Sequence, residues 1–201
     1  ADAYTVGEIY GAGAFLATKY AEQVDHIFNF DVASGIVNSV NGESNTSINS
    51  AWTFTLKDIS NGDYATFLTN HDQNRVMSVL NGKVEKAKLA AVMLLTSPGT
   101  PFIYYGEEIG MQGKKPDEDI RLPMQWSADA NAGFTTGTSW RAPDVNYALV
   151  NVAAQEKDPG SLLNLYRTLT KLRAEHSVLR TGSITILETG NPGIYAALRS
   201  N

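Results

Sequence analysis

Short apolar runs alternate along this chain with segments whose apolar residues recur at helical spacing. Runs with the length and bulky side chains of buried strands lie at residues 4–9, 25–32, 64–68 and 100–105. Helical spacing follows at residues 11–23, 48–59, 83–96 and 161–176, and more weakly at 33–49, which passes into a loop. Strands that alternate with helices predict parallel βα units. We therefore expect an α/β fold with a parallel sheet.

Two parts of the chain depart from this alternation. Residues 183–188 and 193–199 are β segments joined by Thr-Gly-Asn-Pro, which predicts a hairpin. The segment from Ile109 to Pro159 is long, irregular and rich in glycine and proline. A loop of this length inside a compact domain is usually functional.

The composition excludes several classes of function. The 201 residues carry a net charge of −5, which favours neither nucleic acid nor an anionic membrane as a partner. There is no cysteine, so disulfides, thiolate catalysis and cysteine metal sites are excluded. The longest apolar run, Leu89 to Leu95, is far shorter than the ~20 residues that span a bilayer.

The beginning of the chain gives no localisation signal. No signal peptide is visible, which leaves the compartment open between cytoplasmic and secreted. Ala1-Asp2-Ala3 leads directly into a predicted strand without a cap. We therefore expect this chain to be a piece of a longer protein.

Polar residues stand where the third predicted strand ends. Asn70, His71 and Asp72 follow the apolar run at residues 64–68, and Arg75 comes within one turn. A carboxylate beside an imidazole and near a guanidinium is costly at a strand exit unless something polar binds there. In a parallel α/β barrel the strand exits are where the chemistry is done. This motif is the first candidate for a functional site.

A second candidate lies at the end of the first predicted strand. Glu8 stands directly after Gly7 and between apolar neighbours. A lone carboxylate at a strand end is most often only an exposed charge, but a glycine beside it permits close approach of a ligand. His26 begins the second strand without a partner at metal-ligand spacing, so we predict a structural role for it.

Three further stretches accompany this motif. They are Val-Gly-Glu-Ile-Tyr at 6–10, Pro-Gly-Thr-Pro-Phe-Ile-Tyr-Tyr-Gly-Glu-Glu at 98–108 and Arg-Leu-Pro-Met-Gln-Trp at 121–126. In this order and at this spacing, the four stretches resemble the alpha-amylase superfamily of glycoside hydrolases, family 13. The resemblance extends from about Tyr4 to about Leu198.

The resemblance implies a fold. The catalytic domain of the family is a (β/α)₈ TIM barrel followed by a β-sandwich domain. Residues 1–180 are similar to barrel units five to eight, the C-terminal half of the barrel. Residues 181–201 are similar to the first hairpin of the β-sandwich. We therefore expect a partial TIM barrel followed by the start of a C-terminal β domain.

The resemblance also implies a chemistry, the cleavage of α-glucosidic bonds with retention in α-glucans or oligosaccharides by a glycoside hydrolase or transglycosylase. Glu8 is similar to the family's general acid/base, and Asp72 to the carboxylate that stabilises the transition state. The family's nucleophile is an aspartate in a Gly-Phe-Arg-x-Asp type motif, which does not occur here. Without a nucleophile the covalent step is lost, so we expect the isolated chain to be inactive or nearly so.

Substrate contacts are expected from four of the residues in these stretches. His71 is similar to a histidine that binds the same sugar, and Arg75 and Arg121 to arginines that hold substrate or tune the carboxylates. Tyr10 is the fourth. Tyr10, Tyr105, Trp126 and Trp140 could each offer a flat face to a pyranose ring, although packing is the commoner role. Glu107 and Glu108 are predicted to be structural, with one of them bonding loop backbone.

The same resemblance implies partners and cofactors. The expected partner is an α-linked oligosaccharide or polysaccharide, with neither nucleic acid nor membrane. No His, Asp and Glu cluster has ligand spacing, so no cofactor is expected in this chain. Many family members bind calcium, and a longer parent enzyme would hold it on parts not present here. Half a barrel has two open strand edges, which predicts self-association.

Two other functions compete with this one. A non-catalytic, amylase-like binding or partner domain would be expected to lose both Glu8 and Asp72. An unrelated barrel, such as a metal-dependent hydrolase using His71 and Asp72, would be expected to place further histidines at strand ends. Within the family, residues 121–126 and 131–135 favour the oligosaccharide-acting branch, which includes α-glucosidases, oligo-1,6-glucosidases and sucrose- or trehalose-converting enzymes.

Overall fold

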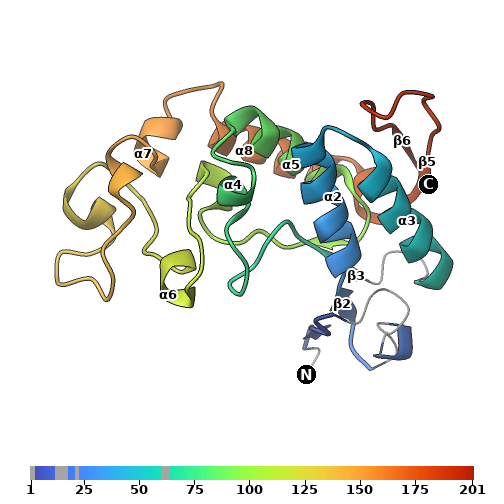
Figure 1. Cartoon of the computed structure of the whole chain (residues 1–201), viewed down its shortest axis with the longest axis horizontal. Helices are drawn as coiled ribbons and strands as arrows, with labels where there is room; N and C mark the ends of the chain where they lie inside the picture. The colour runs from blue at the N-terminus through green and yellow to red at the C-terminus, as the bar shows by residue number, and fades with distance from the viewer. Residues whose placement is uncertain (1–2, 12–17, 21–22, 60–63) are drawn as a thin grey trace. The chain divides into compact units, whose positions relative to one another are not determined.

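The computed structural model describes residues 3–11, 18–20, 23–59 and 64–201 (Figure 1). The chain divides into two compact units. The first unit comprises Ala1–Leu68, Val92–Phe102 and Leu172–Asn201. The second comprises Thr69–Ala91 and Ile103–Lys171. Within the described residues, no helix is both long and apolar enough to cross a membrane.

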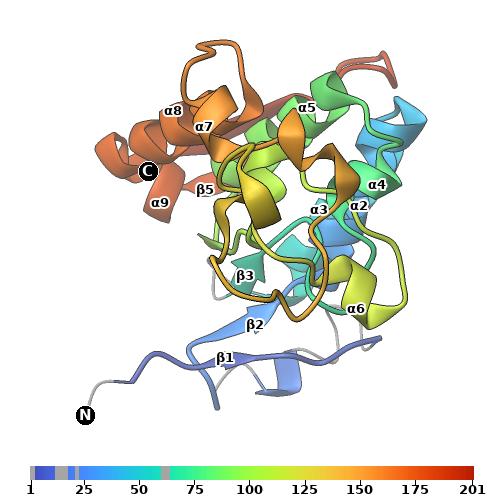
Figure 2. The ribbon, with the colours of Figure 1, turned by 90° about the vertical axis from the view of Figure 1, so that its left-hand side faces the viewer.

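A parallel sheet organises the first unit, as the alternation of strands and helices predicts. Its strands are β1 (Val6–Gly7), β2 (His26–Phe28), β3 (Tyr64–Thr66) and β4 (Thr100–Pro101), and they lie in sequence order. Gly7 pairs with Ile27, Phe28 with Ala65, and Thr66 with Pro101. All three pairs are parallel, so the strands point the same way and their carboxyl ends share one edge of the sheet. Figure 2 shows β1, β2 and β3 of this sheet in that order.

The predicted strand at residues 25–32 is wrong beyond Phe28. Phe30 begins α2 (Phe30–Gly42), and Asn29 is its N-cap, with Oδ1 accepting a hydrogen bond from Val32 N at 2.9 Å. The side-chain amide of Asn29 also donates to Thr55 Oγ1 at 3.0 Å. Phe30 and Val32 suit a strand and a helix equally, and the cap decides between them. The weak helix predicted from Ala33 is thus a regular one.

Helix α3 (Thr46–Asp58) packs closely on α2 and confirms the helix predicted at residues 48–59. A Cβ built on Gly35 of α2 would lie 2.8 Å from Ala51 Cβ of α3, so only glycine permits this approach. The described part of the helix predicted at 11–23 contains η1 (Thr18–Tyr20), and most of that prediction falls outside the described residues. Trp52, Ile36 and Ile48 are fully buried between sheet and helices.

The last residues of two long helices belong to the first unit, where Arg173 joins them. Helices α5 (Val84–Thr96) and α8 (Leu162–Glu175) confirm the helices predicted at 83–96 and 161–176, and α9 (Ser177–Thr181) follows. Arg173 donates to the carbonyl oxygens of Leu95 and Ser97 at the end of α5. Strands β5 (Ser183–Ile186) and β6 (Ala197–Ser200) form the predicted antiparallel pair, with Ser183 opposite Ser200.

The second unit is built mainly from turns and short helices, as the irregular sequence predicts. These helices are α4 (Val76–Val79), η2 (Glu107–Ile109), α6 (Asp117–Ile120), η3 (Ala130–Gly133), η4 (Val145–Ala148) and α7 (Val152–Gln155). Ile109, Met111, Leu122, Met124 and Leu163 form a buried apolar cluster with Val152 against it. This cluster anchors the loop after β4 to the start of α8.

Candidate active site

The segment that carries Asp72 is a turn built by its own side chains. Asn70 Oδ1 accepts a hydrogen bond from Asp72 N at 3.0 Å, and the carbonyl of Asn70 accepts one from Gln73 N at 3.2 Å. Thr69 Oγ1 accepts a hydrogen bond from Val76 N at 3.1 Å, which joins the turn to α4. The Asn70 side chain thus mimics a backbone turn and fixes the backbone at Asp72, which sets the direction of the Asp72 side chain.

Arg121, which lies 49 positions after Asp72 in the sequence, binds this turn. Its Nη2 lies 2.7 Å from Asp72 Oδ1, and its Nε donates to the carbonyl oxygen of His71 at 2.9 Å. His71 Nε2 lies 3.5 Å from Asp72 Oδ2. Three predicted site residues are therefore in contact, and their side chains are 38–56% exposed, so a ligand can reach them.

Asp117 is a second carboxylate at this cluster that sequence reasoning missed. Arg121 Nη2 lies 2.9 Å from Asp117 Oδ2, so one guanidinium nitrogen serves two carboxylates. The hydrogen bond from Lys115, followed by the charges of Arg121 and His71, lowers the pKa of Asp117 below its usual value. The i,i+4 spacing of Asp117, the first residue of α6, and Arg121, directly after that helix, was the signal that could have found it.

Arg75, unlike the exposed side chains of this cluster, is buried. It is 1% exposed, and its Nη1 donates to the carbonyl oxygen of Tyr105 at 2.6 Å. Its guanidinium carbon is 4.5 Å from the ring centre of Tyr104 and 4.6 Å from that of Tyr105. Two roles were open for Arg75 from the sequence, holding substrate or tuning carboxylates. A guanidinium this deeply buried is not positioned to touch a sugar.

Glu107 and Glu108 are held inside the loop after β4. Glu107 Oε1 accepts a hydrogen bond from the Tyr166 hydroxyl at 2.6 Å, and burial raises the pKa of Glu107 to about 8. Burial also raises the pKa of Glu108, while backbone amides of Glu108 and Gly106 oppose the shift. The charge of Arg75 lowers both pKa values. Both residues thus have the structural setting that the sequence predicts, with Glu108 facing loop backbone.

Glu8 and Tyr10 lie in the first unit, directly after β1. Glu8 is exposed, so its apolar sequence neighbours do not enclose it. Tyr10 is 77% exposed and packs edge-on against Phe30, with ring centres 5.4 Å apart. Phe30 contacts Phe67 at 5.0 Å in the same way. An aromatic cluster therefore lies beyond the carboxyl ends of the strands, where Glu8 emerges.

His26 has the structural position expected from the sequence. Its Nε2 lies 3.3 Å from Thr100 Oγ1, and its ring packs on Tyr4. Across the part of the chain that the structure describes, no three His, Cys, Asp or Glu side chains gather as metal ligands would.

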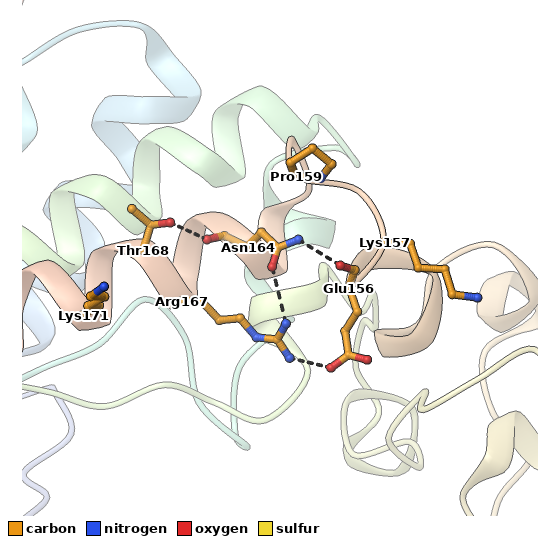
Figure 3. A pocket seen from close by; sticks show the side chains of 7 residues that line it. All are labelled: Glu156, Lys157, Pro159, Asn164, Arg167, Thr168 and Lys171. Atoms are coloured by element: carbon orange, nitrogen blue, oxygen red, sulfur yellow. Dashed lines mark hydrogen bonds and ion pairs between the residues drawn. The ribbon is translucent and has the colours of Figure 1, made fainter.

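A surface cavity of about 450 Å³ lies between α7 and α8 (Figure 3). Arg167 binds two of the other lining residues: its Nη2 lies 2.6 Å from Glu156 Oε1, and its Nη1 is 3.4 Å from Asn164 Oδ1. None of the predicted site residues lines it.

Comparison with known proteins shows to which family this chain is similar. The alpha-amylase catalytic domain family matches residues 1–182. The chain is 38% identical to Alpha-amylase 3 of Dictyoglomus thermophilum, with 97% of this chain and 40% of that protein covered. It is 30% identical to an oligo-1,6-glucosidase of Heyndrickxia coagulans, with 100% of this chain and 46% of that protein covered.

Solved structures give the same result. An alpha-amylase from H.orenii superposes with a TM-score of 0.89 at 36% identity, over 98% of this chain and 41% of that one. A mutant isomaltulose synthase from Erwinia rhapontici NX5, in complex with D-glucose, superposes with a TM-score of 0.84 at 26% identity, over 100% of this chain and 45% of that one. The chain thus spans less than half the length of these relatives, and its fold is of the TIM-barrel type. Because the family match covers most of its residues, the chain belongs to the alpha-amylase family of glycoside hydrolases.

Proposed function

We propose that this chain forms part of a retaining enzyme that hydrolyses or transfers α-glucosidic bonds, with Glu8 as general acid/base and Asp72 as the carboxylate that stabilises the transition state. The observation that carries the proposal is the contact of Asp72 with Arg121 and His71 at an exposed polar turn. Membership of a glycoside hydrolase family supports the same chemistry.

Asp72 is the centre of the proposed site. Glycosidic cleavage passes through an oxocarbenium-like transition state, which a nearby carboxylate stabilises. Arg121 holds Oδ1, so Oδ2 is the oxygen that remains for a sugar hydroxyl, with the His71 imidazole beside it. Because Arg121 already orients Asp72, this carboxylate need not reorient when charge develops on the substrate.

Glu8 and Tyr10 would act from the end of β1. Glu8 would donate a proton to the leaving oxygen and then activate water or an acceptor hydroxyl. Tyr10 would offer its exposed ring to a pyranose face. The proposed nucleophile is an aspartate outside these 201 residues, and the chain alone would then be inactive. We call the protein that joins this chain to that aspartate the complete enzyme.

Arg75 is proposed to position groups rather than to hold substrate. Its buried charge lies close enough to lower the pKa values of Glu107 and Glu108, and it supports the rings of Tyr104 and Tyr105. Of the two roles open to it, Arg121 is proposed to hold the carboxylate of Asp72, and its partly exposed side chain borders the proposed sugar site.

The substrate is proposed to be an α-linked oligosaccharide. The relatives include an oligo-1,6-glucosidase and an isomaltulose synthase, which supports this class. Trp126 and Trp140 are exposed in the long segment of the second unit and could stack on further sugar units. We also propose that residues 181–201 begin a separate C-terminal β domain, because β5 and β6 form their own two-stranded sheet.

The decisive experiment replaces the two carboxylates in the complete enzyme. Glu8→Gln and Asp72→Asn are each expected to lower kcat roughly 10²–10⁴-fold while an α-linked trisaccharide still binds, measured by steady-state kinetics and calorimetry. Glu85→Gln, at an exposed position on α5, is the control. Saccharide binding without any wild-type turnover would favour a non-catalytic domain. Chelator-sensitive activity that survives both changes would favour a metal-dependent hydrolase.

Self-association through strand edges is a further part of the proposal. Among the residues that the structure describes, β1 pairs only with β2 and β4 only with β3, so each has an edge that can pair with another chain. We expect the 201-residue chain to sediment as a dimer or larger species at micromolar concentration. A compact monomer under those conditions would count against it.

A further inference from the structure

Two adjacent tyrosines hold the backbone on both sides of Arg121. The Tyr104 hydroxyl donates to the carbonyl oxygen of Ile120 at 3.0 Å. The Tyr105 hydroxyl donates to the carbonyl oxygen of Leu122 at 2.7 Å. Arg121 is the residue between these two carbonyls. The backbone on each side of Arg121 is therefore tied to the loop after β4.

The rings of Tyr104 and Tyr105 contact each other and the guanidinium of Arg75. Their centres are 4.8 Å apart at an angle of 69°, and the Arg75 guanidinium lies against both of them. Arg75 is further held by the carbonyl of Tyr105 and, through its backbone N–H, by that of Gly113. A cation packed on aromatic rings binds more strongly when it is removed from water. The rings thus have one well-defined position.

Both hydroxyls are suited to act as donors. Burial raises the pKa of Tyr104 to about 12, so its hydroxyl keeps its proton across the neutral range. A carbonyl oxygen can only accept, which fixes the direction of both hydrogen bonds.

The ion pair by itself would not fix Arg121. It is exposed to solvent, and pairs of this kind contribute little on their own because ordering a long side chain offsets the attraction. Arg121 Nη2 also binds Asp117, the first residue of α6, so the same nitrogen is shared between two carboxylates. A fixed backbone keeps the side chain of Arg121 within reach of Asp72 and of the carbonyl of His71.

We propose that Tyr104 and Tyr105 are positioning residues that clamp Arg121 against Asp72 and so hold this carboxylate for the transition state. The inference rests on the proposed function of Asp72. Without the two hydroxyls, the backbone at Arg121 is less restricted, and its contact with Asp72 loosens. The loss is then one of transition-state stabilisation rather than of substrate binding.

The first test is kinetic and uses the complete enzyme. Replacing both tyrosines, Tyr104→Phe with Tyr105→Phe, is expected to lower kcat and kcat/KM by the same factor, about tenfold, and to leave KM unchanged. Each single replacement keeps one hydroxyl and is expected to give a smaller loss, which provides a second measurement if the double variant does not fold. Tyr147→Phe, a half-buried tyrosine of the same unit, is the matched control.

The same replacements are then made in an Arg121→Ala background. If the clamp acts through Arg121, they cause no further loss of kcat there. An equal loss in both backgrounds overturns the proposal, as does a fall in thermal stability with unchanged kcat per folded enzyme.

A second test does not depend on activity. The Nε–H of Arg121 donates to the carbonyl of His71, so its exchange with solvent, followed by ¹⁵N NMR in this chain, reports on the clamp directly. Exchange is expected to be about tenfold faster in the double variant, the factor that a lost hydrogen bond gives. Unchanged exchange refutes the clamp. Faster exchange in a protein whose complete form has no glycosidase activity supports the clamp and refutes the proposed function instead.

Discussion

Arg121 and Asp72 are 49 positions apart in the chain, yet Nη2 of the arginine lies 2.7 Å from Oδ1 of the aspartate. The same arginine donates through Nε to the carbonyl oxygen of His71. Two donors of one planar group therefore hold one turn, which a point charge could not do. This relationship makes the geometry of the guanidinium, and not only its charge, the property to test.

Arg121→Lys keeps the charge and removes the planar fork. A lysine ammonium cannot bind Asp72 and the carbonyl of His71 in the same geometry, so we expect kcat/KM of the complete enzyme to fall roughly 10–100-fold. Steady-state kinetics with an α-linked oligosaccharide measures the change. Arg141→Lys is the control, because Arg141 forms a comparable exposed pair with Asp119. Wild-type kcat/KM in the Arg121→Lys enzyme would contradict a role for the fork.

Glu107→Gln is expected to change how stability depends on pH. Glu107 has an ordinary pKa of 4.5 and a folded-state pKa of about 8, so between these values the folded protein binds more protons than the unfolded one. Its contribution to stability is therefore complete below pH 4.5 and falls as pH rises to about 8. The free energy of unfolding should decline by up to about 1.4 kcal/mol per pH unit in that window.

The glutamine variant should lack this part of the decline, since an amide cannot ionise and still accepts a hydrogen bond from Tyr166. Urea unfolding at a series of pH values measures the slope. Glu156→Gln, at an exposed pair with Arg167, is the control and should keep the wild-type slope. The same slope in Glu107→Gln and wild type would show that Glu107 is ionised in the folded protein.

Gly99→Ala should destabilise the first unit. Gly99 has φ +84°, and a Cβ there would lie 2.5 Å from the carbonyl oxygen of Tyr64 and 2.7 Å from its ring. Strain and overlap together are expected to cost about 2 kcal/mol or more. Gly42→Ala is the matched control, because its Cβ meets nothing within 4 Å at the end of α2, where alanine is favoured. Chemical unfolding compares the two, and equal stabilities would contradict this packing.

Asn29 is predicted to stabilise the first unit through two partners. Asn29→Ala removes the cap of α2 and the donor to buried Thr55, so we expect a loss of about 1–3 kcal/mol in the free energy of unfolding. Thr55→Val removes only the second contact. Measured with the double variant, the pair should show a coupling of about 0.5 kcal/mol or more. Strict additivity would show that the two side chains do not interact.

The sequence predicted the order of the elements better than their boundaries. The parallel strands β1 to β4 and the helices α3, α5 and α8 follow from apolar periodicity, which depends on residues close together in the chain. The boundary at Phe30 could not be found in this way, because its apolar side chain fits either structure. The contact of Asn29 with Thr55, 26 positions away, helps to settle it.

For the site, the motifs identified Asp72, His71 and Arg121 as a group, and the structure brings these three into contact. The burial of Arg75 and the hydroxyl contacts of Tyr104 and Tyr105 had no local signal. They join residues 16 to 30 positions apart across a loop without periodicity.

What the sequence alone determined is the kind of residue at each strand exit and the family to which the chain belongs. What only the tertiary structure decided is which carboxylate oxygen faces Arg121 and which hydroxyls hold the backbone on either side of Arg121. It also decided which arginine is buried. The reason is physical: strand and helix patterns are set by near neighbours, whereas hydrogen bonds between distant segments depend on how the packed loops bring their donors and acceptors together.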